Sequence, residues 1–167
     1  MEAPGYFSMW QTGVDMDNVK IRRILVPTDF SDAAGEAVQA AIVMARAFDA
    51  GIEILHVTAA IMFLPPPAEA VPFSLLMPDL SKKVKDRLVE ESKRVQAAGV
   101  LCDTHSIEGT PHTEIVKRAQ EIGADLIVMG SHGHGGLAHA VLGSVTERVL
   151  HRTPCPVLVV PLRTAHR

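Results

Sequence analysis

Cysteine is scarce in this chain of 167 residues, as are the features that mark secreted, membrane or nucleic-acid-binding proteins. Its two cysteines, Cys102 and Cys155, lie in strand-like surroundings, which is typical of small reduced core residues and not of a disulfide framework. No uninterrupted apolar run approaches membrane-spanning length, and residues 1–20 lack the pattern of a signal peptide. The net charge of -3 favours neither nucleic acid nor an anionic membrane as a partner. We therefore expect a soluble cytoplasmic protein with one globular domain.

Positive charge is missing from residues 119–147, which contain no Lys or Arg. This excludes the P-loop, in which a glycine-rich turn is followed by Lys and then Ser or Thr. The same stretch is nevertheless rich in glycine: a short apolar run at residues 126–129 is followed by Gly130, Gly133, Gly135 and Gly136. The apolar run predicts a buried strand, and glycines allow positive φ or a close backbone approach to a ligand.

A helix start follows this glycine loop. Ser144 and Glu147 have the spacing of a capping box, with Ser144 as the N-cap, so a helix is expected from Val145 to about Arg152. A glycine loop and a helix N-terminus so close in sequence predict a phosphate site made of backbone amides, the Ser144 and Thr146 hydroxyls and a divalent ion. A dinucleotide fingerprint is a weaker alternative, and a plain glycine turn before an ordinary helix is the other.

The spacing of Gly130, Gly133, Gly143 and Ser144 resembles the nucleotide-binding signature of the universal stress protein family. The stretches ILVPTDFS, ILHV, ADLIVMGSHG and TPCPVLVV are similar to that family as well, in the family's order, over residues 20–162. The resemblance implies that ATP, or ADP or AMP, binds with Mg2+ or Mn2+, and that Asp29 contacts the nucleoside. The binding residues it implies are Pro27, Thr28, Asp29, Val57, Met129, Gly130, Ser131, His132, Gly133, His134, Gly143, Ser144, Val145 and Thr146.

Alternating strand and helix patterns predict an α/β fold. Strands are expected at residues 21–26, 52–57, 100–107, 126–129 and 157–160, with the third strand, alternating and more polar, at an edge. The helices between them are expected to end at Gly51, Gly99 and Gly123. This predicts one open five-stranded parallel sheet with helices on both faces, and the resemblance implies the strand order 3-2-1-4-5 of adenine nucleotide alpha hydrolase-like folds. The Asp29 and Gly130 motifs would then meet at the switch point.

Three segments stand apart from this domain. Residues 1–19 are expected to be a disordered or loosely docked extension, with an arm packing on a partner subunit as the alternative, and residues 163–167 a polar tail. Residues 58–80 form an apolar, proline-rich loop, which favours a flap or a packed interface segment and excludes a regular strand or long helix. The charged residues between 82 and 94 indicate a solvated helix face.

Catalytic and metal-binding patterns are weak. His132, His134 and His139 cluster near the glycine loop, but no Cys or carboxylate completes a ligand set, so we expect no structural metal and favour hydrogen bonding of phosphate by His132. No catalytic residues stand out beside the loop. We therefore expect an ATP-binding regulator in the stress response with at most slow hydrolysis. The alternative is a dimeric interaction module of the same fold whose nucleotide site is unused.

The last strand predicts the assembly. Its sequence, PVLVV, is apolar on both faces, and a flat apolar edge promotes pairing with another chain. In the family that the sequence resembles, this strand pairs with its own copy across a two-fold axis. We therefore expect a homodimer through residues 155–161, with residues 59–77 as a second candidate contact.

Overall fold

Five parallel strands form a single sheet in the order β3-β2-β1-β4-β5. The computed structural model describes residues 20–59, 78–133 and 142–162, so the expected extension, the tail and most of the proline-rich loop lie outside the described residues. The strands are β1 (Arg23–Pro27), β2 (Gly51–Ala59), β3 (Cys102–Gly109), β4 (Leu126–Gly130) and β5 (Val157–Val160). The helices are α1 (Asp32–Phe48), α3 (Pro78–Ala97), α4 (Pro111–Ile122) and α5 (Ser144–Leu150). The predicted fold class and strand order are confirmed.

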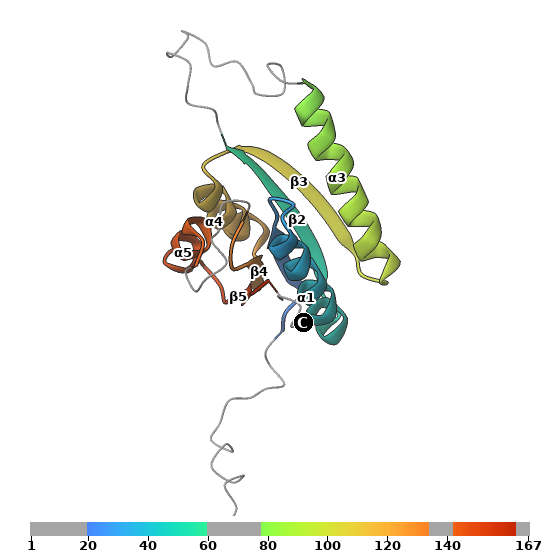
Figure 1. The fold of residues 1–167 in the computed structure, drawn as a ribbon. Helices are drawn as coiled ribbons and strands as arrows, with labels where there is room; N and C mark the ends of the chain where they lie inside the picture. Colours follow the sequence, from blue (N-terminus) through green and yellow to red (C-terminus); the bar gives the residue numbers. More distant parts are fainter. Residues whose placement is uncertain (1–19, 60–77, 134–141, 163–167) are drawn as a thin grey trace, which may run out of the picture.

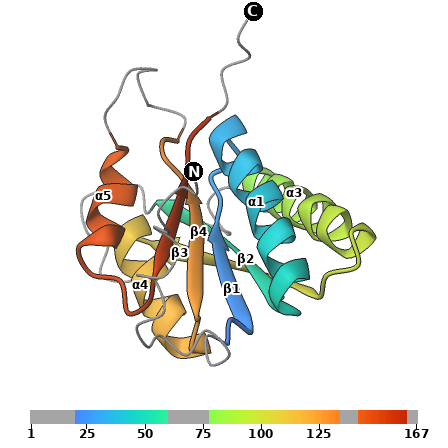
Figure 2. The same cartoon turned by 90° about the horizontal axis from the view of Figure 1, so that it is seen from below.

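Helices cover both faces of the sheet. Figures 1 and 2 show α1 and α3 on one face and α4 and α5 on the other. Alternate residues of β1 serve the two faces: Ile24 and Val26 pack with α1 and α3, whereas Leu25 packs with α4 and α5. All three are fully buried, which explains why the middle of β1 is apolar on both faces. β3, which is more polar, lies at one edge as predicted.

Several predicted element ends are wrong, each for a local reason. Helix α1 ends at Phe48 because Asp49 takes a left-handed conformation with φ of 54° and donates its amide to Ala45, so Gly51 begins β2 instead. Phe48, the last residue of α1, is 41% exposed. The expectation that proline excludes a helix from residues 58–80 fails at Pro78, which occupies the first helical turn, where a missing amide hydrogen does no harm.

The strand beside the proline-rich segment is longer than predicted. β2 continues to Ala59 because it pairs with β3 as far as Gly109, and β3 begins at Cys102 instead of Val100. The helix end at Gly123 is confirmed, with a left-handed φ of 59°. Gly99 also has a left-handed φ, of 80°, two residues after α3 ends at Ala97.

Candidate functional site

A pocket of about 390 Å³ lies where the strand order reverses, at the carboxyl ends of β1 and β4. This is the position at which ligands bind in open α/β sheets, because the loops leave β1 and β4 toward opposite faces. The residues that line the pocket are Pro27, Thr28, Asp29, Ala34, Leu55, Val57, Pro111, Ile115, Met129, Gly130, His132, Gly133, Gly143, Ser144, Val145 and Thr146. The Pro-Thr-Asp motif and the glycine motif, about 100 residues apart, therefore meet in one pocket as expected.

Most of the predicted site residues line this pocket, with two differences. Ser131 is not among the lining residues: it is buried, and its hydroxyl lies 2.9 Å from Nδ1 of His132. His134 lies outside the described residues, as do Gly135, Gly136 and His139. Whether the lining residues bind nucleotide stays a prediction at this point.

Asp29 lies at the edge of the pocket and is hydrogen-bonded to the start of helix α1. Its Oδ1 accepts hydrogen bonds from the amide and the hydroxyl of Ser31, at 3.0 and 2.6 Å. Ser31 is the N-cap of α1, and its hydroxyl in turn accepts from the Ala34 amide at 3.3 Å. Asp29 therefore supports the cap without being the cap itself, and it also lines the pocket.

The glycines of the motif are required by three different close approaches. A β-carbon at Gly130 would lie 2.9 Å from the backbone carbonyl of Ala33 in α1. One at Gly133 would collide with Oδ2 of Asp29, and one at Gly143 would lie 3.3 Å from the carbonyl oxygen of Ser131. None of these three has a left-handed φ, so close packing, and not positive φ, is the reason for glycine here.

The start of α5 differs from the predicted capping box. Gly143 is the N-cap and Ser144 the first helical residue, with no side-chain cap bond. The Gly143 amide donates to the Ser131 carbonyl at 2.8 Å, which closes the loop and starts the helix one residue early. Glu147 is consequently four residues from the cap, one too many for a capping box.

The two hydroxyls expected to hold phosphate are placed differently. Thr146 is 3% exposed, and its hydroxyl donates to the Gly130 carbonyl at 3.0 Å, so its proton ties α5 to the end of β4. Ser144 is exposed at the pocket. Of the two, Ser144 is the better placed donor for a ligand.

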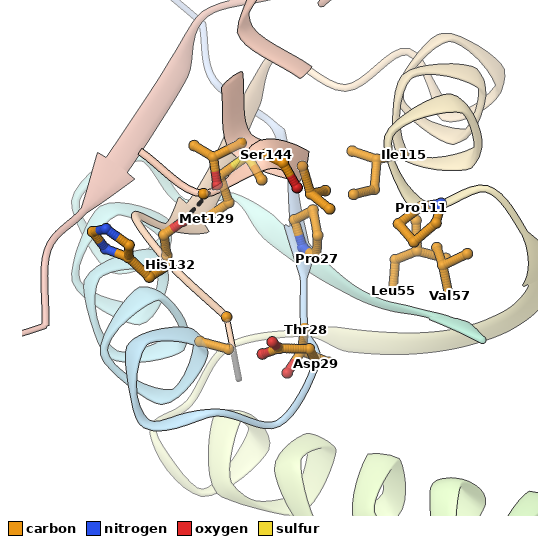
Figure 3. Close-up of a pocket in the computed structure, with 16 residues that line it drawn as sticks. Pro27, Thr28, Asp29, Leu55, Val57, Pro111, Ile115, Met129, His132 and Ser144 are labelled. Carbon is orange, nitrogen blue, oxygen red and sulfur yellow. Dashed lines mark hydrogen bonds between the residues drawn. The ribbon is translucent and has the colours of Figure 1, made fainter. Parts of the chain in front are cut away.

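One wall of the pocket is apolar, and most of it was missed from the sequence. Leu55 and Val57 come from β2, and Pro111 and Ile115 from α4; Figure 3 shows this group on one side of Pro27 and His132 on the other. Of the four, only Val57 was predicted. Pro111 begins α4 and Ile115 is one of its buried residues. The signal that could have found them is the position of α4 directly after β3, beside β2.

An ion pair holds α4 against the sheet. Arg118 donates to both carboxylate oxygens of Glu53 in β2, at 2.7 and 3.0 Å, and a third bond reaches Glu121 at 3.2 Å. The hydrogen bonds from Arg118 to Glu53 raise the pKa of the guanidinium further above its ordinary value. Because Glu53 and Arg118 are both partly buried, this bidentate pair fixes how α4 lies over β2, and with it the apolar wall.

Charge in the pocket is sparse. Its described lining contains one carboxylate, Asp29, one imidazole, His132, and no Lys or Arg. Within the described part of the chain, no group of three or more His, Cys, Asp or Glu side chains could hold a metal ion. A search of the described residues also finds no helix long and apolar enough to cross a membrane.

Comparison with known proteins identifies the family. Residues 20–161 match the model of the universal stress protein family. Universal stress protein MJ0531 of Methanocaldococcus jannaschii is 40% identical over 139 residues, which cover 83% of this chain and 81% of that protein. The structure of universal stress protein UspA from Lactobacillus plantarum superimposes with a TM-score of 0.75 at 29% identity, covering 84% of this chain and 98% of that chain. A universal stress protein in complex with cAMP gives a TM-score of 0.64 at 28% identity, covering 86% of this chain and 99% of that chain. Sequence motifs, sheet order and these matches agree, and the chain belongs to the universal stress protein family.

Proposed function

We propose that the pocket binds an adenine nucleotide, ATP in preference to ADP or AMP, and that the protein is a nucleotide-dependent regulator in the stress response with at most slow hydrolysis. The observation that carries this proposal is the division of the pocket into two chemically different parts. Leu55, Val57, Pro111 and Ile115 offer an apolar surface that suits a planar base. Gly133 and Gly143 offer backbone atoms without side chains, which suits phosphate.

Asp29 supplies the polar group for the nucleoside in this arrangement. A carboxylate accepts hydrogen bonds only, so it matches the hydroxyls of ribose and would repel phosphate. Asp29 follows strand β1, whereas the residues proposed to bind phosphate follow strand β4. The family match supports the nucleotide class, because one structural relative was solved in complex with cAMP.

A triphosphate in this pocket requires a cation, because no Lys or Arg is among the described lining residues. Mg2+ or Mn2+ would supply that charge, held chiefly by the phosphates, with the Ser144 hydroxyl as an available oxygen ligand of the protein. ATP affinity should therefore fall sharply in EDTA. Metal-independent binding would show that a more distant cation, such as Arg148, neutralises the phosphates.

We also propose a homodimer through residues 155–161 and a cytoplasmic location. β5 is the last strand of the described sheet, and Leu158 and Leu162 are 36% and 46% exposed. An apolar sheet edge of this kind is stabilised by pairing with a second copy. Cys102 and Cys155 are unpaired thiols, as is usual in a reducing compartment.

The nucleotide proposal is tested by calorimetry with ATP, AMP and pyrophosphate. Asp29→Ala should lower ATP and AMP affinity by about 10- to 100-fold, the loss of a hydrogen bond to a charged group, and leave pyrophosphate binding unchanged. Asp29→Asn is the matched variant, because its amide oxygen still accepts from Ser31 and keeps the start of α1 intact. Absence of binding of any nucleotide by a folded dimer would favour an interaction module instead.

A further inference from the structure

The turn that presents Asp29 contains a strained residue. Phe30, directly after Asp29, has a left-handed backbone with φ of 65°. A bulky aromatic residue rarely adopts this conformation, and it persists only where surrounding contacts enforce it. The contacts around Phe30 therefore decide how the preceding carboxylate is aimed.

The turn is held by Phe30 itself and by two side chains from elsewhere, His56 of β2 and Arg87 of α3. We call these three residues the Phe30 clamp. The Phe30 ring stacks on the His56 ring, with centroids 4.7 Å apart and planes 25° from parallel. The Arg87 guanidinium lies over the same ring, 4.5 Å from its centroid. Arg87 is exposed on the charged face of α3, as expected, and its guanidinium also packs on the turn.

The clamp also binds the backbone on both sides of Asp29. Nδ1 of His56 lies 2.9 Å from the Thr28 carbonyl oxygen, and because a carbonyl only accepts, Nδ1 carries the hydrogen and donates it. Arg87 donates to the Phe30 carbonyl at 3.2 Å. The carbonyl before Asp29 and the carbonyl after it are thus both fixed by side chains from elsewhere in the fold. Within the turn, the Phe30 amide donates to the Thr28 hydroxyl at 3.0 Å.

No member of the clamp lines the pocket, so any effect on a ligand must pass through the turn. We propose that Arg87 and His56 are positioning residues for nucleoside binding, which hold Phe30 in its left-handed conformation and thereby keep the Asp29 carboxylate in the pocket. This rests on the proposed nucleotide function and adds to it a dependence of nucleoside affinity on helix α3, which contributes no residue to the pocket.

The test compares Arg87→Met, which keeps the length of the side chain but removes its charge and donors, with Arg87→Lys. Lys85→Met is the matched control, an exposed cation on the same helix. Arg87→Met should weaken ATP and AMP binding about three- to tenfold and leave pyrophosphate binding unchanged, as expected for the loss of one cation–π contact and one hydrogen bond. Arg87→Lys should recover part of the loss, and Lys85→Met should show none.

A double-mutant cycle shows whether Arg87 acts through Asp29. In an Asp29→Asn background, Arg87→Met should cause no further loss of ATP affinity, because the carboxylate that the clamp aims is already gone. Phe30→Leu should reproduce the Arg87→Met loss by removing the ring that both partners contact. Full additivity in the cycle, equal weakening of pyrophosphate, or unchanged ATP affinity in both Arg87→Met and Phe30→Leu would overturn the proposal. Failure of the wild-type protein to bind any adenine nucleotide would instead refute the proposed function, and with it the positioning role of the clamp.

Discussion

Alanine substitutions at Gly130, Gly133 and Gly143 should have three different consequences, although all three glycines belong to one sequence motif. A β-carbon at Gly133 collides with the Asp29 carboxylate. At Gly143 it meets the Ser131 carbonyl oxygen at 3.3 Å and Cα of His132 at 3.4 Å, contacts that small shifts of the neighbours relieve. At Gly130 it meets the backbone carbon and oxygen of Ala33 at 2.9 Å, and these belong to helix α1 and have no rotamer to change.

The size of each effect follows from what must move. In Gly133→Ala, the flexible Asp29 side chain can turn away at little cost in stability, but its carboxylate then leaves the position proposed for nucleoside binding. The loss of that hydrogen bond, about 1.5–3 kcal/mol, corresponds to roughly 10- to 100-fold in ATP affinity. Gly143→Ala should weaken ATP less than about fivefold, or under ~1 kcal/mol. Gly130→Ala overpacks the contact between β4 and α1, at about 1–3 kcal/mol, and should lower Tm by about 2–12 °C for a chain of this length.

Calorimetry with ATP and a thermal melt on each variant measure both quantities. The expected pattern is a large loss of affinity with little change in Tm for Gly133→Ala, and a large loss of Tm for Gly130→Ala. Gly143→Ala serves as the matched control, since it lies in the same loop and the same pocket. An affinity loss at Gly143 equal to or greater than that at Gly133, or an unchanged Tm for Gly130→Ala, would refute this assignment of roles.

Three further predictions concern other parts of the molecule. Ile115→Ala, which trims the apolar wall, should weaken ATP and AMP about three- to tenfold but not pyrophosphate; calorimetry showing equal losses for all three ligands would place the base elsewhere. Val159→Lys should convert the proposed dimer to monomer or aggregate, and light scattering that reports an unaltered dimer would move the interface away from β5. Burial raises the pKa of the Cys102 and Cys155 thiols, so both stay protonated at neutral pH. Iodoacetamide should therefore label them slowly until the pH exceeds the ordinary thiol range, and rapid labelling at pH 7.5, followed by mass spectrometry, would contradict this.

The strands could be predicted from short-range patterns, whereas the meeting of the two motifs rested on the strand order that the family resemblance implies. The apolar run at residues 126–129 is too short for a helix and so predicts a buried strand, and Pro27, Thr28 and Asp29 follow a similar run. The order of the strands had another basis. Alternation of strands and helices predicts a parallel sheet, but the order 3-2-1-4-5 came from the family resemblance. Helix ends were less predictable, because Asp49 adopts the left-handed conformation in place of the expected Gly51.

The tertiary contacts could not be predicted from the sequence. Arg87 has the same surroundings in the chain as the solvated lysines around it, and only the packing of α3 beside the Asp29 turn gives it a partner. The apolar wall could not be predicted for the same reason. In the sequence, Leu55, Pro111 and Ile115 are ordinary core or helix-start residues. They form one wall only because Arg118 and Glu53 fix α4 over β2.

The contact of Gly130 with Ala33 bears on how ligand preference in this pocket can diverge. The backbone of β4 approaches the backbone and the β-carbon of Ala33 there, so a larger residue at position 130 would push β4 and α1 apart. The wall formed by Leu55, Val57, Pro111 and Ile115 consists of side chains, each replaceable by a larger or smaller one. Substitutions are therefore poorly tolerated where β4 meets α1, whereas the apolar wall can change its shape through substitution. If the pocket binds a nucleotide as proposed, substitutions in the apolar wall should change which base it accepts and leave the contacts with the phosphates unchanged.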